Sequence, residues 1–322
     1  MEKAPVLVTG ATGLVGRALC GALGREGIPF VVLSRRPDRA RRLVPGARLY
    51  RLWQPIERGS PWAGIVEKAR AVVHLASPLT GPGRWNHSHR QELYEGCVVG
   101  TRCVVSALAQ ARSRPEVLVC ASSAAFYAQD PTGECLSAED DGLAGDDFLA
   151  RLVADWEAAA LHAEQFGVRV VTLRSGLVLG LQGALPRLRR AARLGLGGAL
   201  PPGTQRQPWV HVDDVVGLVM QALRDGRVAG ALNVVAPHSV TCAEFMRAVR
   251  ALSQMVGGVP QPKWWLRSRL GAGAVMVTNG RGAVPTRALE LGYEFRQPRL
   301  HPALQHTLGP PEAGDGSVSI TA

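Results

Sequence analysis

A glycine-rich turn between a short apolar run and a helical pattern constrains this chain more than any other feature. The apolar run over residues 5–9 leads into Gly10, Gly13 and Gly16, and a second apolar run follows at 30–33. The first glycine lets the chain turn sharply, the second lets backbone N–H groups approach an anion, and the third lets helix and strand pack closely. Within a complete βαβ unit, this spacing predicts a dinucleotide-binding turn rather than an ordinary loop.

Further apolar runs alternate with helical patterns along the chain. Strands are predicted at 71–76, 117–121 and 168–174, and helices around 92–112 and over 147–166. Such alternation is typical of parallel sheets covered by helices on both faces. We therefore predict an α/β fold, a Rossmann-type doubly wound parallel sheet with a smaller C-terminal substrate lobe.

The domain boundaries follow from a change of pattern near residue 180, after which the chain becomes richer in glycine and proline. We expect a dinucleotide-binding Rossmann domain over 1–180, to which the later segment 209–236 returns. Residues 181–308 are expected to form most of the C-terminal lobe, and 309–322 a flexible tail.

The composition argues against membrane-spanning and disulfide-rich classes. Hydrophobic residues make up 46% of the chain and charged residues 20%, as in ordinary globular proteins. No uninterrupted apolar stretch approaches about 18 residues, and no signal peptide is visible, so we expect a soluble intracellular protein. The six cysteines form no C-x-x-C pair, which favours reduced thiols over disulfides or a zinc site.

The net charge of +11 comes almost entirely from arginine, because the only lysines are Lys3, Lys68 and Lys263. This charge favours acidic partners such as nucleotides, anionic lipid or RNA. It also fits the mitochondrial matrix, with the cytoplasm as the alternative. Since no nucleic-acid recognition motif accompanies the charge, we expect no specific nucleic-acid partner.

The second predicted strand ends in Ser34, Arg35 and Arg36, where an NAD-specific site would present an acidic residue to the ribose. A guanidinium suits a 2′-phosphate because it offers two parallel N–H donors to phosphate oxygens. These residues therefore favour NADP(H) as the cofactor. The alternative is that the arginines belong to a solvated basic run over 35–42.

Several motifs together resemble the extended short-chain dehydrogenase/reductases. Within that superfamily the chain resembles an atypical branch, the sugar nucleotide epimerase-like NADP-binding family, over residues 5 to about 305. The resemblance rests on Thr9 before the glycine turn, His74-Leu75-Ala76, Ser122 ahead of Tyr127, Arg84-Trp85, Phe148–Ala150, Asp155–Ala159, Arg174–Gly180, Gly195–Gly198, Pro208–Asp214, Leu232–Pro237 and Gly292–Phe295. The family usually has asparagine at the position of His74 and arginine at that of Cys97.

The resemblance implies a set of cofactor contacts and a lobe that closes over the nicotinamide. The implied cofactor-binding residues are Gly10, Thr12, Gly13, Leu14, Val15, Gly16, Ser34, Arg35, Leu75, Ala76 and Val178.

The catalytic pair of the superfamily is missing from this chain. Its reductases use a tyrosine as general acid and a lysine four residues later, but the corresponding positions are Leu149 and Val153. The remaining candidates are Ser122, which aligns with a substrate-orienting serine, and Tyr127. Tyr127 is either a proton donor whose pKa a nearby cation such as Arg174 lowers, or a structural tyrosine with a hydrogen-bonded hydroxyl.

Histidines supply a second set of candidates. His211 and Asp213 form either an acid–base pair or a structural histidine beside a helix capped by Asp213 or Asp214. His87 and His89 lack a carboxylate or cysteine at ligand spacing, so no metal site is predicted.

Two basic segments could contact a partner. Residues 187–194 form a basic amphipathic stretch, and 263–267 place adjacent tryptophans in a basic context. Each is compatible with the protein's own core or solvated surface, with another subunit, or with peripheral contact to a membrane.

Two functions follow from these observations. The first is an NADP(H)-dependent oxidoreductase or epimerase-like protein that acts on an unknown small molecule. The alternative is a non-catalytic NADP(H)-binding subunit of a larger assembly, such as a mitochondrial respiratory complex.

Overall fold

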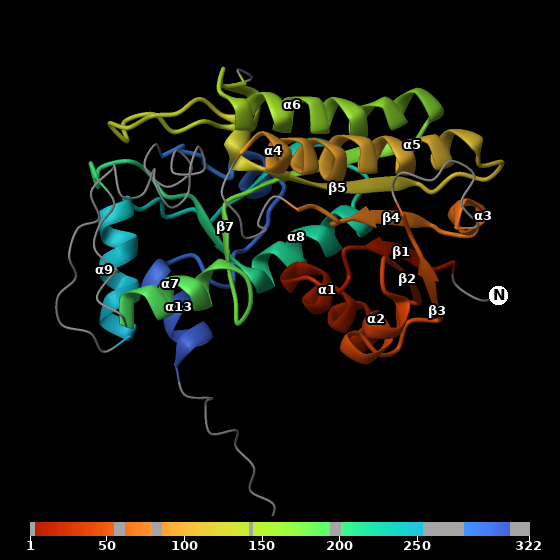
Figure 1. Ribbon diagram of the computed structural model, residues 1–322, viewed down its shortest axis with the longest axis horizontal. Helices are drawn as coiled ribbons and strands as arrows, with labels where there is room; N and C mark the ends of the chain where they lie inside the picture. Colours follow the sequence, from red (N-terminus) through yellow and green to blue (C-terminus); the bar gives the residue numbers. More distant parts are fainter. Residues whose placement is uncertain are drawn as a thin grey trace, which may run out of the picture.

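The structure is a computed structural model that describes residues 4–54, 62–78, 86–141, 144–193, 201–253 and 280–309. Its centre is a seven-stranded parallel sheet in the order β3-β2-β1-β4-β5-β6-β9, beside a two-stranded parallel sheet, β7-β8 (Figure 1). The strands are β1 Val6–Thr9, β2 Phe30–Ser34, β3 Leu49–Leu52, β4 Ala71–His74, β5 Val117–Ser123, β6 Arg169–Ser175, β7 Leu177–Leu179, β8 Trp209–His211 and β9 Gly230–Val234.

Helices lie on both faces of the large sheet and in a separate group beside it. The helices are α1 Leu14–Arg25, α2 Pro37–Leu43, α3 Ala63–Val66, α4 His87–Tyr94, α5 Gly100–Gln110, α6 Phe148–Leu161, α7 Ala184–Arg193, α8 Val212–Arg224, α9 Cys242–Leu252, α12 Thr286–Glu290 and α13 Leu300–Leu308. Short 3₁₀ segments are η2 Ala124–Phe126, η3 Glu139–Asp141 and η4 His162–Phe166, and η1 Glu95–Val99 is π-helical. This arrangement confirms the predicted Rossmann-type α/β fold.

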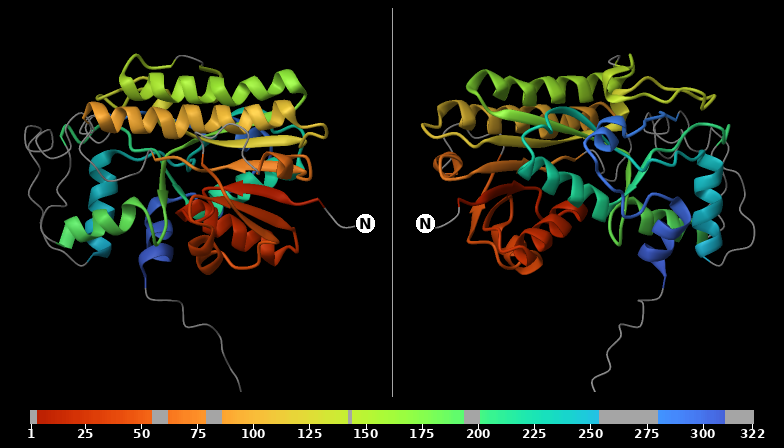
Figure 2. Two further views of the ribbon diagram at one scale, coloured as in Figure 1. Left: turned by 45° about the vertical axis from the view of Figure 1, so that its right-hand side comes forward. Right: turned by 180° about the vertical axis from the view of Figure 1, so that it is seen from behind.

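The alternation of strand side chains divides the main core in two. In β1, Leu7 packs among buried residues of α5 and α6, whereas Val6 and Val8 pack among those of α1 and α8. Because successive side chains of a strand point to opposite faces, one apolar strand supplies both cores. Figures 1 and 2 accordingly place α4, α5 and α6 on one face of the sheet and α1, α2 and α8 on the other.

A third core lies outside the large sheet. It contains Leu179 and Trp209 from the small sheet, with Phe245 from α9 and Leu304 from α13. Between these lobe elements the chain returns to the main sheet, where α8 packs on it and β9 pairs with β6. The small sheet and α7, α9 and α13 thus form a lobe beside the carboxyl ends of the main strands (Figure 1).

The predicted helix around 92–112 is longer than expected and begins earlier. Asn86 caps it by accepting the His89 N–H at 2.9 Å, so α4 begins at His87. The π-helical turn η1 then joins α4 to α5 without a break. Periodicity alone locates neither feature, because one depends on a polar cap and the other on a local change in hydrogen bonding.

In the described residues no helix is long and apolar enough to cross a membrane. All six cysteines are free thiols. Four of them are buried, Cys103 is half-buried and Cys135 is exposed.

Candidate functional site

The glycine turn after β1 is packed too tightly for side chains at two of its three glycines. Gly10 has a φ of 68°, and a Cβ there would lie 2.5 Å from the Leu75 carbonyl carbon. A Cβ at Gly16 would lie 2.6 Å from Ala11 Cα and closer still to the Gly10 carbonyl oxygen. Real Cβ atoms essentially never approach so closely. Gly10 therefore allows the sharp turn, and Gly16 allows the close packing of helix and strand, as the sequence predicts.

The middle glycine leaves the start of α1 open. A Cβ at Gly13 would meet just the Gly10 carbonyl oxygen, at 3.4 Å. Gly13 is the N-cap of α1, no side chain caps this end, and the first turn carries no acidic residue. The Arg17 Nε donates to the Thr12 carbonyl at 3.0 Å, which holds a guanidinium beside the turn. Uncapped N–H groups and a nearby cation are what an anion requires at a helix N-terminus.

The loop after β4 is fixed against this turn by a small polar cluster. The Thr9 Oγ1 accepts the Ala76 N–H at 3.3 Å and contacts the His74 Nδ1 at 2.7 Å. Burial lowers the pKa of His74 to about 4, so the imidazole is neutral near pH 7. These bonds place Leu75 and Ala76 beside Gly10 at the carboxyl edge of the sheet, as the sequence predicts for residues of one site.

The lobe reaches the same turn through the segment after β7. A Cβ at Gly180 would lie 2.5 Å from the Leu14 Cδ1, so this segment runs directly over the beginning of α1. Val178, in the strand just before, is half-buried and packs against the core on the α1 side. The structure thus brings Leu14 and Val178 to one side of the turn.

The end of β2 carries the two arginines predicted to select the cofactor. The Ser34 Oγ accepts the Arg36 N–H at 3.1 Å, which shapes the turn before α2. The side chains of Arg35 and Arg36 are exposed. Farther along the basic run, the Arg41 guanidinium lies over the ring of Tyr50, with its carbon 5.3 Å from the ring centroid.

A buried ion pair lies below the carboxyl ends of β5 and β6. Arg174 donates to both Glu157 oxygens, through Nε at 3.0 Å and NH2 at 2.9 Å. Ser122 donates to the same carboxylate at 2.5 Å. Burial acts to lower the pKa of Arg174, but its bonds to Glu157 outweigh burial and raise it, so the guanidinium stays charged.

Tyr127 belongs to this buried network. Its hydroxyl donates to Asn233 Oδ1 at 2.7 Å and accepts from Arg174 at 3.0 Å, and the residue is 1% exposed. Burial raises the pKa of Tyr127, and the bond from Arg174 offsets part of that rise. The same network continues through Asn233, whose N–H donates to Glu139 at 2.8 Å. This geometry favours the structural alternative for Tyr127.

The positions of the missing catalytic pair are apolar and inaccessible. Leu149 is 3% exposed and Val153 fully buried, and both pack in the core between α6 and the sheet. Neither can transfer a proton.

Two serines end β5, and their hydroxyls have different surroundings. Ser122 is buried against Glu157, whereas Ser123 is half-buried and its Oγ accepts the Ala125 N–H at 3.1 Å. Ser122 was predicted as a candidate from the sequence, and Ser123 was not. The alternation of strand residues is the signal that separates them, because adjacent side chains point to opposite faces.

The predicted cap of α8 is wrong. His211 caps this helix, since its Nδ1 accepts the Asp213 N–H at 3.2 Å. Asp214 is fully buried instead, and its carboxylate accepts the N–H groups of Arg296 at 2.7 Å and Gln297 at 3.0 Å. A chain segment some eighty residues away therefore takes up the carboxylate that the sequence pattern assigned to a cap.

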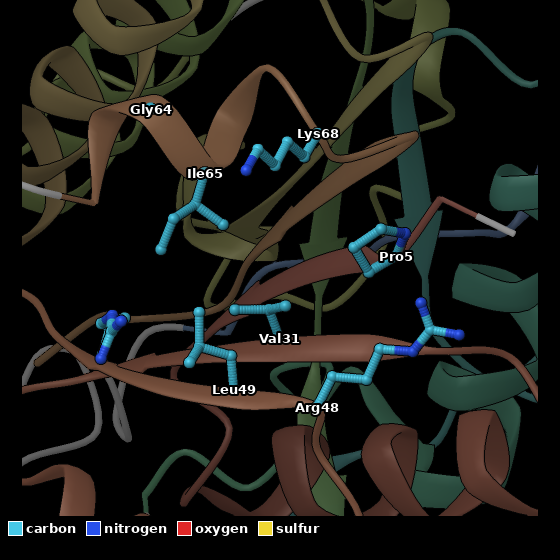
Figure 3. Close-up of a pocket in the computed structure, with 8 residues that line it drawn as sticks. Pro5, Val31, Arg48, Leu49, Gly64, Ile65 and Lys68 are labelled. Carbon is cyan, nitrogen blue, oxygen red and sulfur yellow. The ribbon is translucent and has the colours of Figure 1, made fainter. Parts of the chain in front are cut away.

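Two hollows lie away from the glycine turn. One, of about 500 Å³, is lined by Val31, Leu49 and Lys68 among others, near the opposite, amino-terminal edge of the sheet (Figure 3). The other, of about 550 Å³, is bordered by α5 and α6. We place the candidate site at the carboxyl edge rather than in these hollows, because ligands of open α/β sheets bind where the strands end.

Some predicted features fall outside the described residues. These are Arg84-Trp85, Gly195–Gly198, Lys263–Arg267 and the tail from 310.

The fold and the glycine turn define a dinucleotide-binding α/β protein, and the comparisons agree. Residues 6–235 match the NAD dependent epimerase/dehydratase family, and the chain belongs to this family. It is an atypical extended short-chain dehydrogenase/reductase of the epimerase-like kind. Residues 261–307 match a domain of unknown function, DUF1731.

Relatives are similar over most of their length. The human epimerase family protein SDR39U1 is 33% identical over 93% of this chain and 98% of its own. A chloroplastic homologue from Arabidopsis thaliana is 33% identical over 93% of this chain and 85% of its own, so it gives the mitochondrial prediction no support. A crystal structure of human SDR39U1 isoform 2 with NADPH has a TM-score of 0.80 at 32% identity, covering 94% of this chain and 99% of that one.

Proposed function

We propose that this protein is an NADP(H)-dependent oxidoreductase or epimerase-like enzyme that acts on a small molecule. The observation that carries the proposal is the glycine turn: Gly10 and Gly16 have no room for a side chain, and the start of α1 at Gly13 has no side-chain cap. The solved human relative is described with NADPH, which supports the same cofactor here.

The residues of the site fit a dinucleotide phosphate. The uncapped N–H groups at Leu14 and Val15 would face the pyrophosphate, with Arg17 beside them. The exposed guanidinium of Arg35 would face a 2′-phosphate at the end of β2. Such a cofactor supplies hydride transfer, and the protein supplies binding and orientation.

The proton needed with the hydride would not come from Tyr127. Its hydroxyl is 1% exposed, its proton is donated to Asn233, and its pKa is raised by burial. We propose that Tyr127 and Arg174 hold β5, β6 and β9 together below the site. Ser123, half-buried at the end of β5, is the better placed hydroxyl for orienting a substrate.

Cofactor titration tests the proposal. NADPH and NADH are titrated against the wild type, Arg35→Ser and Arg39→Ser, where Arg39 is an exposed arginine of the same basic run. Because bonds to charged groups contribute about 1.5–3 kcal/mol, we expect Arg35→Ser to weaken NADPH binding by roughly 10- to 100-fold and to leave NADH binding unchanged. Arg39→Ser should match the wild type.

Two other results of the titration would contradict the proposal. Equal affinity of the wild type for NADPH and NADH would overturn the cofactor preference, and no binding of either would overturn the function. NADPH oxidation with a panel of carbonyl compounds then separates the two candidates. Turnover supports an enzyme, whereas tight binding without turnover supports the non-catalytic subunit.

A further inference from the structure

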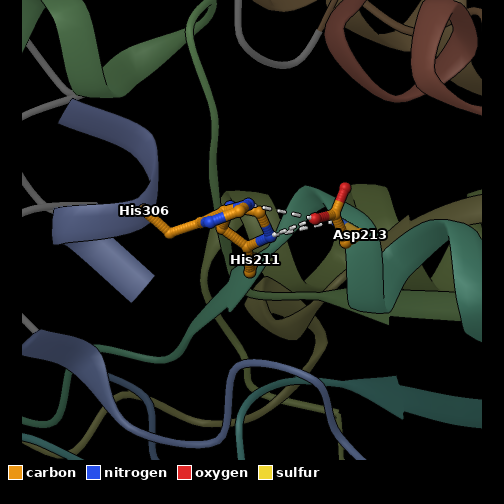
Figure 4. A group of neighbouring side chains, drawn as sticks. All are labelled: His211, Asp213 and His306. Atoms are coloured by element: carbon orange, nitrogen blue, oxygen red, sulfur yellow. Dashed lines mark hydrogen bonds and ion pairs between the residues drawn. The ribbon is translucent and has the colours of Figure 1, made fainter. Parts of the chain in front are cut away.

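Three potential metal ligands converge where the lobe meets the main domain. They are His211 at the end of β8, Asp213 in the first turn of α8, and His306 in the last turn of α13 (Figure 4). The Asp213 Oδ2 lies 3.4 Å from His211 Nδ1 and 3.6 Å from His306 Nε2. One ligand atom from each residue lies within 4.8 Å of the other two.

The hydrogen bonds around His211 determine which of its nitrogens carries the proton. The Thr307 hydroxyl donates its single proton to the Ala303 carbonyl at 2.9 Å. It must therefore act as acceptor in its contact with His211 Nε2 at 3.1 Å, so Nε2 carries the proton. In the neutral ring, Nδ1 then presents a lone pair, and this nitrogen faces Asp213 (Figure 4).

This arrangement is the one that metal-binding histidines adopt. Such histidines donate the proton of one ring nitrogen to a neighbouring oxygen, which orients the other nitrogen toward the ion. Without an ion, the lone pair of Nδ1 and the carboxylate oxygen of Asp213 repel each other across 3.4 Å. The Asp213 N–H donates to Nδ1 at 3.2 Å, but this bond does not neutralise the charge of the carboxylate beside it.

We propose that His211, Asp213 and His306 form a site for a divalent transition-metal ion, with Zn²⁺ as the best fit. Zinc binds imidazole nitrogen and carboxylate oxygen at about 2.0–2.2 Å in tetrahedral geometry, which places neighbouring ligand atoms roughly 3.3–3.6 Å apart. Two of the three separations, 3.4 and 3.6 Å, already have this value. Binding at Nδ1 displaces the Asp213 N–H from it.

Two of the three side chains in the cluster are accessible to solvent. His211 is 3% exposed, whereas the side chains of Asp213 and His306 are 41% and 50% exposed. The ion can therefore enter from solvent and keep water as its fourth ligand. Since His306 belongs to α13 in the lobe and Asp213 to α8 on the main sheet, the ion would connect the two parts of the fold.

Zinc titration by calorimetry tests the site in metal-free protein. We expect one Zn²⁺ per chain in the wild type and at least tenfold weaker binding in His306→Ala and in Asp213→Asn. His301→Ala is the matched control, because His301 is an exposed histidine of the same helix, and it should bind like the wild type. Cobalt substitution should give the intense visible absorption of a tetrahedral site in the wild type and the control alone.

Thermal unfolding supplies a readout of the connection between lobe and sheet. Zn²⁺ should raise the Tm of the wild type and of His301→Ala, and leave that of His306→Ala unchanged, because an ion that binds the folded state alone stabilises it. The proposal fails if the wild type binds no Zn²⁺, or if binding persists unweakened in His306→Ala. It fails equally if His87→Ala or His89→Ala abolishes binding, since the ion would then occupy α4.

Discussion

At the scale of single residues, the Arg174–Glu157 pair is the strongest electrostatic feature below the site. The two side chains are 7% and 6% exposed, so water does not solvate their charges and each charge is stabilised by the other. We predict that Arg174→Leu lowers the free energy of unfolding by about 3–5 kcal/mol, because it leaves a carboxylate buried without its partner. Urea unfolding followed by circular dichroism measures the change.

The control for this prediction is an exposed pair of the same chemistry. Arg227 and Asp225 lie 2.7 Å apart with the arginine 74% exposed, so Arg227→Leu should cost far less stability than Arg174→Leu, because solvent screens the exposed pair. The double variant Arg174→Leu/Glu157→Leu should regain part of the loss, because it removes both charges. Equal costs for the buried and the exposed arginine would contradict this account.

The same network marks the limit of what single residues disclose in a sequence. Ser122, Tyr127 and His211 were predicted as candidate site residues, and the structure shows all three buried. Arg174 was predicted as a cation near Tyr127, and it does donate to the Tyr127 hydroxyl. The bond from Tyr127 to Asn233 was not foreseen, since it spans 106 positions of the chain. A residue type predicts which bonds a side chain can form, but the fold decides which partner it meets.

At the scale of elements, the junction of β1 and α1 depends on the absence of a side chain. A Cβ at Gly16 would collide with the Gly10 carbonyl and Ala11. We therefore predict that Gly16→Ala lowers the free energy of unfolding by about 1–3 kcal/mol and weakens NADPH binding, because helix and turn must move apart. Calorimetric titration with NADPH and urea unfolding of the same samples give both quantities.

Gly24 offers a matched control on the same helix. A Cβ there would have nothing within 4 Å. Gly24→Ala should thus leave NADPH binding unchanged and raise stability by about 0.5–1 kcal/mol, because alanine restricts the unfolded chain more than glycine does. A loss of NADPH affinity in Gly24→Ala would show that the helix tolerates no substitution, whatever the local space.

Elements were predictable where their signal is local. The predicted strands 117–121 and 168–174 are found as β5 and β6, extended or shifted by one or two residues, because buried parallel strands are nearly continuous apolar runs. The beginning of α4 and the π-helical η1 were not predicted. They reflect the Asn86 cap and a local change in backbone hydrogen bonding, which leave little trace in hydrophobic periodicity.

At the scale of the whole molecule, β4 lies in the middle of the sheet, paired with β1 and β5. Val72 contributes to the core on one face and Val73 to the core on the other. His74 follows them, fully buried, with its ring 5.5 Å from that of Trp53. Because side chains alternate along β4, His74 lies on the face of Val72, and its exposure to water requires the core that contains Trp53 to open.

Stability should therefore depend on pH through His74. Its pKa is about 4 in the folded protein, lowered by burial from the usual 6.5. Above pH 6.5 the ring is neutral in both states. Between pH 6.5 and 4 the unfolded chain takes up a proton that the folded protein does not, so the free energy of unfolding falls by about 3 kcal/mol across that window.

The variant His74→Asn isolates this contribution. Asparagine can still bond to Thr9 but does not titrate in this range, so the variant should lose less stability than the wild type on acidification from pH 7 to pH 4. Carboxylates and the other histidines titrate in both proteins, and their contributions cancel when the two urea-unfolding curves are subtracted at each pH. The remaining difference should grow as the pH falls below 6.5 and level off near pH 4. A difference that does not vary with pH would mean that the wild type protonates His74 while folded, and that the central strand admits water or a counter-charge without unfolding.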